Sequence, residues 1–513
     1  KLRGHRIELG EIETQLLHVG SVAEAVVIAR GDQEGQQQLC AYFVADQQLT
    51  VYDLKAQLSQ ELPSYMVPSY FIQLEQMPLT PNGKINRNAL PAPEGGIHTG
   101  AEYVAPRTWM EVKLVQIWQE VLGLETIGIR DNFFEIGGHS LRATNLVAKI
   151  YKEMNKNLPL RDVFQYPTIG QMANVIVGKE QSTYTSIPVT EEREYYPVSS
   201  AQKRLYILSQ FTGGEISYNM PDIVMIEGSL DKQRVEEAFQ KLIERHETLR
   251  TSFEMVNGEP VQRVHQEVDF SISHVRASLE EAKEHVRGFI REFDLKMAPL
   301  LRVGLIETNP DRYLLLFDMH HIISDGVSMG NLIQEFARLY AGEELSPLRI
   351  QYKDYAAWQH TNVHSEQMQQ QEAYWLDAFR KEIPVLDLPT DYVRPALQSF
   401  AGETIEFVIE DHDREGLKKL AAQTGSTLHM VMLAAYTTLL HKYTGQEDII
   451  VGTPIAGRPH ADLEDMIGVF LNTLALRNYP SKDKSFDEYL QEVKVNALKA
   501  YENQDYPFEE LVE

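Results

Sequence analysis

A Gly-Gly pair placed just before a serine is the feature that most constrains this chain. Residues 131–141 have the sequence DNFFEIGGHSL, and the apolar residues that follow Ser140 recur at helical spacing. Gly137 and Gly138 leave the backbone free to turn sharply, so we expect Ser140 at the start of a helix. The free N–H groups and partial positive charge there favour a phosphate ester on the serine hydroxyl. A serine that only caps the helix is the alternative.

Length and composition limit the remaining possibilities. The chain has 513 residues, which predicts about three domains, and its formal net charge is −26. Such an acidic chain is a poor candidate for binding nucleic acid or an anionic membrane. A single cysteine, Cys40, excludes internal disulfides and indicates a reducing, cytoplasmic setting. The chain begins with Lys1 inside a motif, so we expect it to be part of a longer protein.

The most apolar stretch does not predict a membrane span. Residues 428–440 are too few to cross a bilayer, and His429 interrupts them. They predict a buried helix that begins near Ser426 or Thr427 and ends before Gly445. We therefore expect no membrane association.

The first segment, residues 1–93, predicts a small α+β domain. A helix over about 8–17 is followed by short strands at 24–30 and 38–45 and by a second helix over 51–63. In the loop LTPNGKINRNAL, a Pro-Asn-Gly turn presents Lys84, which could neutralise a carboxylate or a phosphate. A solvated lysine at the tip of a hairpin is the alternative.

The middle of the chain predicts a small helical bundle between two linkers. Residues 94–104 are rich in proline and glycine, and residues 181–195 are polar, so both indicate flexible linkers. Between them, residues 105–180 predict several short amphipathic helices. A modified serine on a tethered domain can visit several sites, because tethering makes each visit intramolecular.

The third segment contains HHIISDG, residues 320–326, after a strand predicted from Tyr313 to about His320. Side chains alternate along a strand, so His320 and His321 should point in opposite directions, and only one can face a given active site. Asp325 and Gly326 begin the next helix, where Asp325 could be the N-cap. The motif alone leaves three possibilities: a metal site, which the diverging histidines argue against, a structural histidine, or acyl transfer to an amine.

Two stretches resemble parts of known assembly-line enzymes. DNFFEIGGHSL resembles the attachment motif of peptidyl carrier domains, which implies 4′-phosphopantetheine on Ser140 and a phosphopantetheinyl transferase as a partner. LRGHRIELGEIE, LPSYMVP and NGKINR resemble the C-terminal subdomain of nonribosomal peptide synthetase adenylation domains. That resemblance implies that Lys84 contacts the amino-acid carboxylate and ATP, although Asn86 stands where the family has aspartate. ATP and Mg²⁺ would bind only with the adenylation core, whose Gly-rich phosphate loop does not occur in these residues.

The third segment resembles the condensation domains of the same synthetases. The resemblance rests on SSAQKRLYIL, RHETLRTSF, MHHIISDGVS, YKDYAAW, IGVFLNTLALR and NQDYPFEEL, in that order. It implies two lobes similar to chloramphenicol acetyltransferase, residues 196–360 and 361–513, the second expected to be incomplete, with a tunnel between them. It also implies that His321 is the active-site histidine and that His320 and Asp325 support it, with Gly326 at the helix start.

The resemblance further implies that Asp325 pairs with an arginine. We expect that partner to be Arg245, with Arg250 and Arg458 as alternatives. Asn472 and the GTPIAGRPH loop either line the tunnel or are ordinary strand and turn residues.

Together these expectations describe a multidomain α+β fold: an adenylation tail, a four-helix carrier bundle and a two-lobed α/β condensation domain. The whole resembles peptide antibiotic synthetases of the tyrocidine and bacitracin type. The implied reaction transfers an acyl group to the amine of an aminoacyl thioester on a downstream carrier, with an adenylation core and another condensation domain upstream. The alternatives for the third segment are an epimerisation domain and a docking scaffold without activity. The sequence does not choose between a basic and a positioning role for His321.

Overall fold

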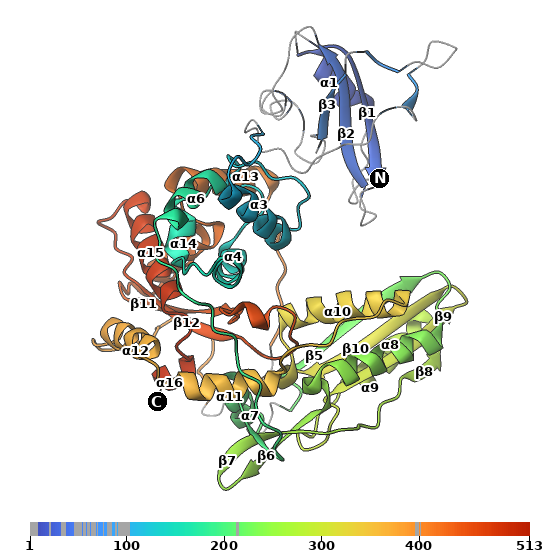
Figure 1. Cartoon of the computed structure of the whole chain (residues 1–513), viewed down its shortest axis with the longest axis vertical. Helices are drawn as coiled ribbons and strands as arrows, with labels where there is room; N and C mark the ends of the chain where they lie inside the picture. Colours follow the sequence, from blue (N-terminus) through green and yellow to red (C-terminus); the bar gives the residue numbers. More distant parts are fainter. Residues whose placement is uncertain are drawn as a thin grey trace. The chain divides into compact units, whose positions relative to one another are not determined.

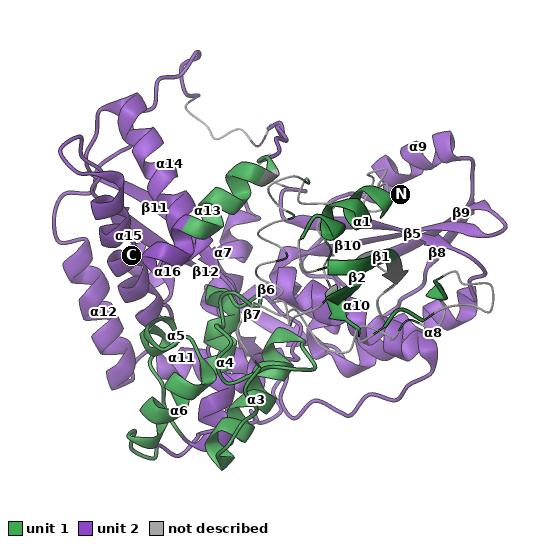
Figure 2. Cartoon of the chain, turned by 90° about the horizontal axis from the view of Figure 1, so that it is seen from above, with its two compact units in different colours: residues 1–146, 156–181, 409–419 green, residues 147–155, 182–408, 420–513 purple. Residues whose placement is uncertain are grey.

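The computed structural model describes residues 9–19, 22–31, 37–45, 54, 58, 62, 68, 70–74, 76–78, 85–87, 90, 103–211, 215–395, 400 and 402–512. The chain divides into two compact units (Figure 2). The first contains residues 1–146, 156–181 and 409–419, and the second contains residues 147–155, 182–408 and 420–513. Lys84 and most of the helix predicted over 51–63 lie outside the described residues.

The N-terminal part of the first unit has the predicted helix and strands. α1 (Leu9–Leu17) is followed by β1 (Val22–Gly31) and β2 (Gln37–Ala45), which pair in antiparallel fashion, and β3 (Tyr70–Gln73) pairs parallel to β2. Apolar side chains of α1 share a core with both longer strands. The predicted α+β character of this part is therefore confirmed.

The carrier part of the chain contains the four predicted helices. They are α3 (Trp109–Leu122), α4 (Ser140–Met154), α5 (Leu160–Gln165) and α6 (Ile169–Val177). Thr108 begins α3 with a capping box to Glu111, and Gly123 ends it in the left-handed conformation at φ 70°. Trp118 is fully buried.

A four-stranded sheet organises the second unit, and β10 (Arg312–His320) lies within it (Figure 1). Its neighbours β5 (Asn219–Glu227) and β9 (Leu301–Asn309) are antiparallel to it, and β8 (Ser273–Arg276) is parallel to β9. The strand predicted up to His320 is thus confirmed, and its last residue is the first histidine of HHIISDG.

Alternate residues of β10 pack in two different cores. Tyr313, Leu315 and Phe317 join the main core with α8 (Lys232–Arg245) and α10 (Gly326–Ala341). Leu314 and Leu316 instead pack with residues of α9 (Leu279–Phe289). This alternation is the period of two expected of a strand covered on both faces.

The other elements complete the second unit. A three-stranded antiparallel sheet has the order β4-β7-β6, and β11 pairs with β12. These remaining elements are β4 (Tyr196–Pro197), α7 (Ser200–Leu208), η3 (Glu247–Arg250), β6 (Thr251–Val256), β7 (Glu259–Val264), η4 (His321–Ile323), α11 (Tyr352–Asn362), α12 (Glu366–Ala378), α13 (Asp411–Thr424), α14 (Leu428–Thr444), β11 (Ile449–Ile455), η5 (Ala461–Leu463), β12 (Asn472–Asn478), α15 (Phe486–Glu502) and α16 (Phe508–Val512).

The apolar helix α14 begins and ends as predicted. Thr427 caps its first turn by accepting a hydrogen bond from Met430 N–H, and Gly445 ends it at φ 72°. The predicted burial holds for one face only, because Met432, Tyr436 and other residues of the opposite face are exposed. Across the described part of the chain, no helix has the length and hydropathy needed to span a membrane.

Candidate functional site

Ser140 is the first residue of α4, as predicted. The turn before it needs both glycines, for different reasons. Gly137 has φ 103°, a left-handed conformation that a side chain would strain. A Cβ on Gly138 would lie 2.3 Å from the ring of Phe133 and 2.4 Å from the Phe133 carbonyl oxygen. The Gly-Gly pair therefore lets the turn close against Phe133 and leaves Ser140 half-buried at the helix start.

The surroundings of Ser140 suit a phosphate ester. The first turn of α4 contains no acidic residue, and its N–H groups carry the positive end of the helix dipole. Arg142 lies in the same turn, where its guanidinium donates to the Gly137 carbonyl at 3.0 Å. Burial and this arginine lower the pKa of His139, which favours the neutral ring next to the serine. These residues fit a phosphopantetheine attachment site.

His321 begins the short helix η4 directly after β10. Its backbone N–H donates to Tyr218 O at 2.7 Å, and its ring Nδ1 lies 2.7 Å from Ser324 O. A carbonyl oxygen only accepts, so Nδ1 must carry the proton, and in the neutral ring Nε2 is a proton acceptor. Among the described residues Nε2 has no partner, and the half-buried ring can therefore receive a proton from a bound group.

His320 has the opposite arrangement. Its side chain is buried beside the rings of Tyr218 and Phe293, and its Nδ1 accepts a hydrogen bond from Ile322 N–H at 3.1 Å. Burial, together with the neighbouring His321, lowers the pKa of His320 to about 4. The ring is therefore neutral near pH 7, with its proton on Nε2. It also lines a cavity of about 490 Å³ that Phe253 and Phe293 share.

Asp325 is the N-cap of α10, as predicted, and is fully buried. One carboxylate oxygen accepts from Ser328 N–H at 2.8 Å, and the other accepts from Phe470 N–H at 2.9 Å. The second contact joins the start of α10 to the segment before β12, which lies more than a hundred residues away in the sequence. The aspartate thus holds the end of the HHIISDG loop with hydrogen bonds from two backbone groups.

The arginine that pairs with Asp325 is Arg458, so the expectation of Arg245 is wrong. Arg458 lies 3.4 Å from the Asp325 carboxylate and donates to Ser328 Oγ at 2.7 Å. It also donates to the Leu463 and Met466 carbonyls and lies over the Phe470 ring, 4.0 Å from the centroid. Burial lowers its pKa, and the nearby Asp325 carboxylate opposes that shift.

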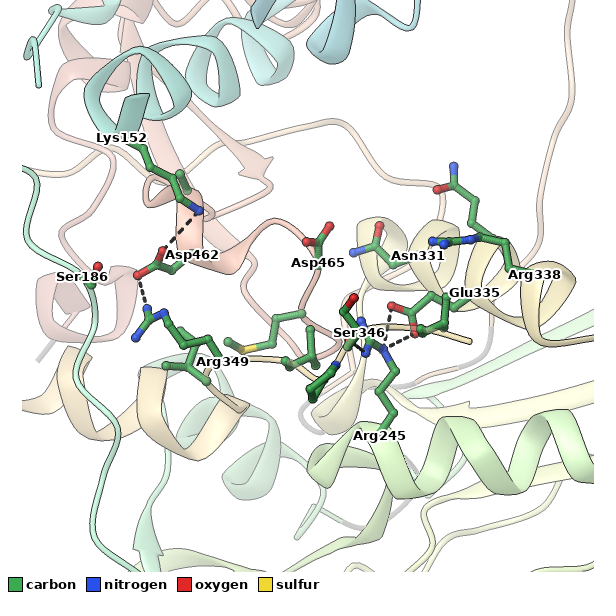
Figure 3. Close-up of a pocket in the computed structure, with 17 residues that line it drawn as sticks. Lys152, Ser186, Arg245, Asn331, Glu335, Arg338, Ser346, Arg349, Asp462 and Asp465 are labelled. Atoms are coloured by element: carbon green, nitrogen blue, oxygen red, sulfur yellow. Dashed lines mark hydrogen bonds and ion pairs between the residues drawn. The ribbon is translucent and has the colours of Figure 1, made fainter. Parts of the chain in front are cut away.

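Arg245 instead pairs with Glu335 of α10, at 3.1 Å to each carboxylate oxygen (Figure 3). It also donates to Ser346 O. His246, which is buried, contacts the same carboxylate at 2.6 Å. Burial raises the pKa of Glu335, but the contacts with His246 and Arg245 outweigh it, so the pKa is lowered. The RHETLR motif therefore holds α8 against α10 and does not reach Asp325.

Sequence reasoning missed two residues that complete this buried cluster, Ser328 and Tyr352. Ser328 Oγ donates to Gly468 O at 2.7 Å and accepts from Gly468 N–H at 3.1 Å. Tyr352 contacts Ser199 Oγ at 2.7 Å and donates to Val469 O. A Cβ on Gly468 would lie 1.9 Å from the Tyr352 ring. The sequence signal was their place in MHHIISDGVS and YKDYAAW, two of the stretches that carry the family resemblance.

Asn472, considered as a tunnel residue, has a structural role. Its amide donates to Gln504 O at 2.9 Å and to Tyr506 O at 2.8 Å, and its Oδ1 accepts from Phe508 N–H at 3.0 Å. It therefore connects β12 to the NQDYPFEEL stretch. In the part of the chain that the structure describes, no cluster of histidine, cysteine or carboxylate side chains is suited to hold a metal ion.

Three family profiles match the chain in succession. The AMP-binding enzyme C-terminal domain matches residues 11–84, the phosphopantetheine attachment site matches residues 112–176, and the condensation domain matches residues 192–513. The last match covers more than half of the chain and contains every residue of the buried cluster around Asp325.

Known proteins share this organisation. Gramicidin S synthase 2 from Aneurinibacillus migulanus is 54% identical over 100% of this chain, which covers 12% of that protein. Bacitracin synthase 3 from Bacillus licheniformis is also 54% identical over 100% of this chain, which covers 8% of it. The chain thus spans a small part of these relatives.

Solved structures share the fold of the second unit. The X-domain from teicoplanin biosynthesis matches 64% of this chain and 75% of its own, with a TM-score of 0.59 and 25% identity. The first condensation domain of the calcium-dependent antibiotic synthetase matches 63% of this chain and 76% of its own, with a TM-score of 0.53 and 21% identity. The chain therefore belongs to the condensation domain family of nonribosomal peptide synthetases, and the end of an adenylation domain and a phosphopantetheine carrier precede its condensation domain.

Proposed function

We propose that this chain holds an acyl or peptidyl thioester through Ser140 and acts in peptide bond formation within its synthetase. In that reaction the acyl group passes to the α-amine of an aminoacyl thioester on a downstream carrier. The observation that supports it most directly is the hydrogen bond from His321 Nδ1–H to Ser324 O, because it leaves Nε2 as a proton acceptor.

The chemistry requires one proton transfer that His321 can perform. As the C–N bond forms, the amine must lose a proton, and as the C–S bond breaks, the departing sulfur must gain one. An α-amine has an ordinary pKa of about 8, so a useful fraction is already unprotonated near neutral pH. His321 Nε2 can accept the remaining proton and return it to sulfur, or it can orient the amine by accepting its hydrogen bond.

Asp325 supports this histidine without contacting substrate. It caps α10 and accepts from Phe470 N–H, so it fixes the C-terminal end of the loop from His320 to Gly326. We therefore assign Asp325, Gly326 and His320 to positioning, and Arg458 takes the place that Arg245 was expected to fill.

The cofactor and remaining partners follow from the carrier and the adenylation tail. When bound, 4′-phosphopantetheine supplies the thiol that carries the acyl group. Ser140 would receive it from a phosphopantetheinyl transferase, at a helix start whose N–H groups favour the phosphate. Lys84 would contact the amino-acid carboxylate and ATP, with Mg²⁺ bound by the upstream adenylation core.

Two experiments test this function in the synthetase that contains the chain. Incubation with a phosphopantetheinyl transferase and coenzyme A should add one arm fewer to the Ser140→Ala variant than to the wild type, by intact mass. With both carriers preloaded, His321→Ala should slow product formation by about 10²–10⁴-fold. The exposed His360 offers a matched control, since His360→Ala should leave the rate unchanged. Full activity of His321→Ala would contradict the proposal.

A docking function is the second candidate. The structurally similar X-domain was solved in a complex with OxyB from teicoplanin biosynthesis. If this chain only docks other domains, the wild type with both carriers loaded should give no product. Epimerisation is the other alternative, and it predicts exchange of the α-hydrogen on the residue carried by Ser140, which mass spectrometry in deuterated water would detect.

A further inference from the structure

The residues between the carrier and the condensation domain do not behave as the predicted linker. Residues 177–191 lie outside both profiles, which end at 176 and begin at 192. Yet Ile187 is 0% exposed and belongs to the main core of the second unit, with Leu463 and Met466. Val189, two positions later, is 64% exposed. A single apolar side chain of this polar stretch is therefore inserted into the condensation domain.

The peptide group of Ile187 is held as firmly as its side chain. Its N–H donates to Asp462 Oδ2 at 3.1 Å, and its carbonyl accepts from Arg349 at 2.9 Å. Arg349 and Asp462 also pair with each other, next to Ser186 and at one side of a cavity of about 650 Å³ (Figure 3). One ion pair thus satisfies both the N–H and the C=O of the buried Ile187. Hydrogen bonds to charged groups are stronger than those between neutral groups.

Contacts on either side extend this attachment to residues 184–190, which we call the strap. His460 Nε2 lies 2.9 Å from Thr185 O, and because a carbonyl only accepts, Nε2 carries the proton. His460 Nδ1 then accepts from the Tyr184 hydroxyl at 2.9 Å. At the other end, Thr190 N–H donates to the buried carboxylate of Asp354 at 2.8 Å. Every one of these receptor groups belongs to the condensation domain.

We propose that the strap is an anchoring segment that the condensation domain binds as it would bind a peptide, so that it shortens the free tether of the carrier. Helix α6 ends at Val177, so residues 178–183 are the longest possible tether, and Ser182 and Thr183 within it also bond to Asn155, which follows α4, and to Tyr151 of α4. At about 3.3–3.6 Å per residue, six residues reach about 20 Å, whereas the eighteen residues 178–195 would reach about 60 Å.

The shorter tether has a consequence for delivery of the donor acyl group. The effective concentration of a tethered partner falls with about the −3/2 power of tether length, so a threefold shorter tether raises it about fivefold. The strap would therefore favour delivery from Ser140 to this condensation domain over delivery elsewhere. This consequence rests on the proposed function, whereas the anchoring itself does not.

Amide hydrogen exchange on this chain tests the anchoring without any activity. In the wild type, the amides of Ile187 and Thr190 should be protected, and Ile187→Ser should speed their exchange on the order of tenfold to a hundredfold. The matched control Val189→Ser should leave both rates unchanged. If the Ile187→Ser chain fails to unfold cooperatively, the Tyr184→Phe variant is used instead. It removes the hydrogen bond to His460 Nδ1 and should speed exchange of the same two amides by about 2–10-fold. Wild-type amides that exchange as fast as those of a free 182–195 peptide would overturn the proposal.

Product formation in the synthetase then tests the tether. Ile187→Ser should slow transfer from an acyl group on Ser140 about fivefold, and it should leave transfer from the same acyl group on free pantetheine unchanged. An equal loss with both donors would show damage to the condensation site and would overturn the tether argument. A failure of the proposed function would instead abolish product from both donors in the wild type, with the exchange result unaffected.

Discussion

The pairing of Asp325 with Arg458 makes a quantitative prediction that also separates it from the pairing with Arg245. Asp325→Ala removes the cap of α10, leaves Phe470 N–H without its acceptor and leaves Arg458 beside no carboxylate. Loss of a cap costs about 1 kcal/mol, and a buried donor without a partner costs about 1–3 kcal/mol. With the unpaired charge included, the expected loss is about 3–5 kcal/mol.

The corresponding shift in melting temperature follows from the size of the unit. Residues 192–513 match the condensation domain. With about 2.1 cal/mol/K per residue, their unfolding entropy is about 0.7 kcal/mol/K, so Asp325→Ala should lower Tm by about 4–7 °C. Scanning calorimetry measures this shift in Tm. Arg245→Ala should cost less, about 1.5–3 kcal/mol, since Glu335 keeps its contact with His246.

A double-mutant cycle gives the decisive comparison. Asp325 and Arg458 are in direct contact, so their effects should be non-additive by about 0.5–3 kcal/mol. Asp325 and Arg245 have no common partner among the described contacts, so their effects should add to within about 0.5 kcal/mol. A coupling between Asp325 and Arg245 as large as that between Asp325 and Arg458 would refute the assignment.

Two further predictions concern the carrier turn and the first histidine. Gly138→Ala should destabilise the carrier by about 1–3 kcal/mol, because the added Cβ would overlap Phe133. Scanning calorimetry measures this loss, and an unchanged Tm would contradict the prediction. The pKa of His320 is about 4 in the folded chain, against an ordinary value of about 6.5. Between these two pH values the unfolded chain therefore binds more protons than the folded chain, and the free energy of unfolding falls as the pH drops from about 6.5 to about 4. This ring lowers the free energy of unfolding by up to about 3 kcal/mol at the acid end of that range. The His320→Asn variant keeps an acceptor for Ile322 N–H, and its Tm should depend less steeply on pH. An unchanged slope would contradict the assignment.

Local chemistry explains what the sequence could predict. The N-cap at Asp325, the ends of α14 at Thr427 and Gly445, and the helix start at Ser140 depend on neighbours within one turn. The partner of Asp325 was not predictable in this way. Arg458 is 133 positions away and reaches the carboxylate only because the chain folds back at Gly457, where φ is 60° and a Cβ would lie 1.6 Å from Phe470 O.

Average composition is also a poor guide where one residue decides. The stretch 181–195 is polar enough to indicate a flexible linker, and most of its side chains are indeed exposed. Ile187 alone fills a core position, and the receptor groups Arg349 and Asp462 come from distant segments. The exposed face of α14 is the converse case, since an apolar run predicts burial but not which neighbours cover it.

The two histidines of HHIISDG show that backbone geometry, more than residue type, assigns chemical roles at this site. His320 Nδ1 accepts from a backbone N–H, whereas His321 Nδ1 donates to a backbone carbonyl. The same side chain thus carries its proton on Nε2 at one position and on Nδ1 at the next. Burial then lowers the pKa of His320 so that its ring stays neutral, whereas Nε2 of the half-buried His321 has no partner in the described part of the chain. Since Asp325 fixes the end of this loop through Ser328 N–H and Phe470 N–H, we expect it to position His321 through the backbone, without acting as a proton acceptor itself.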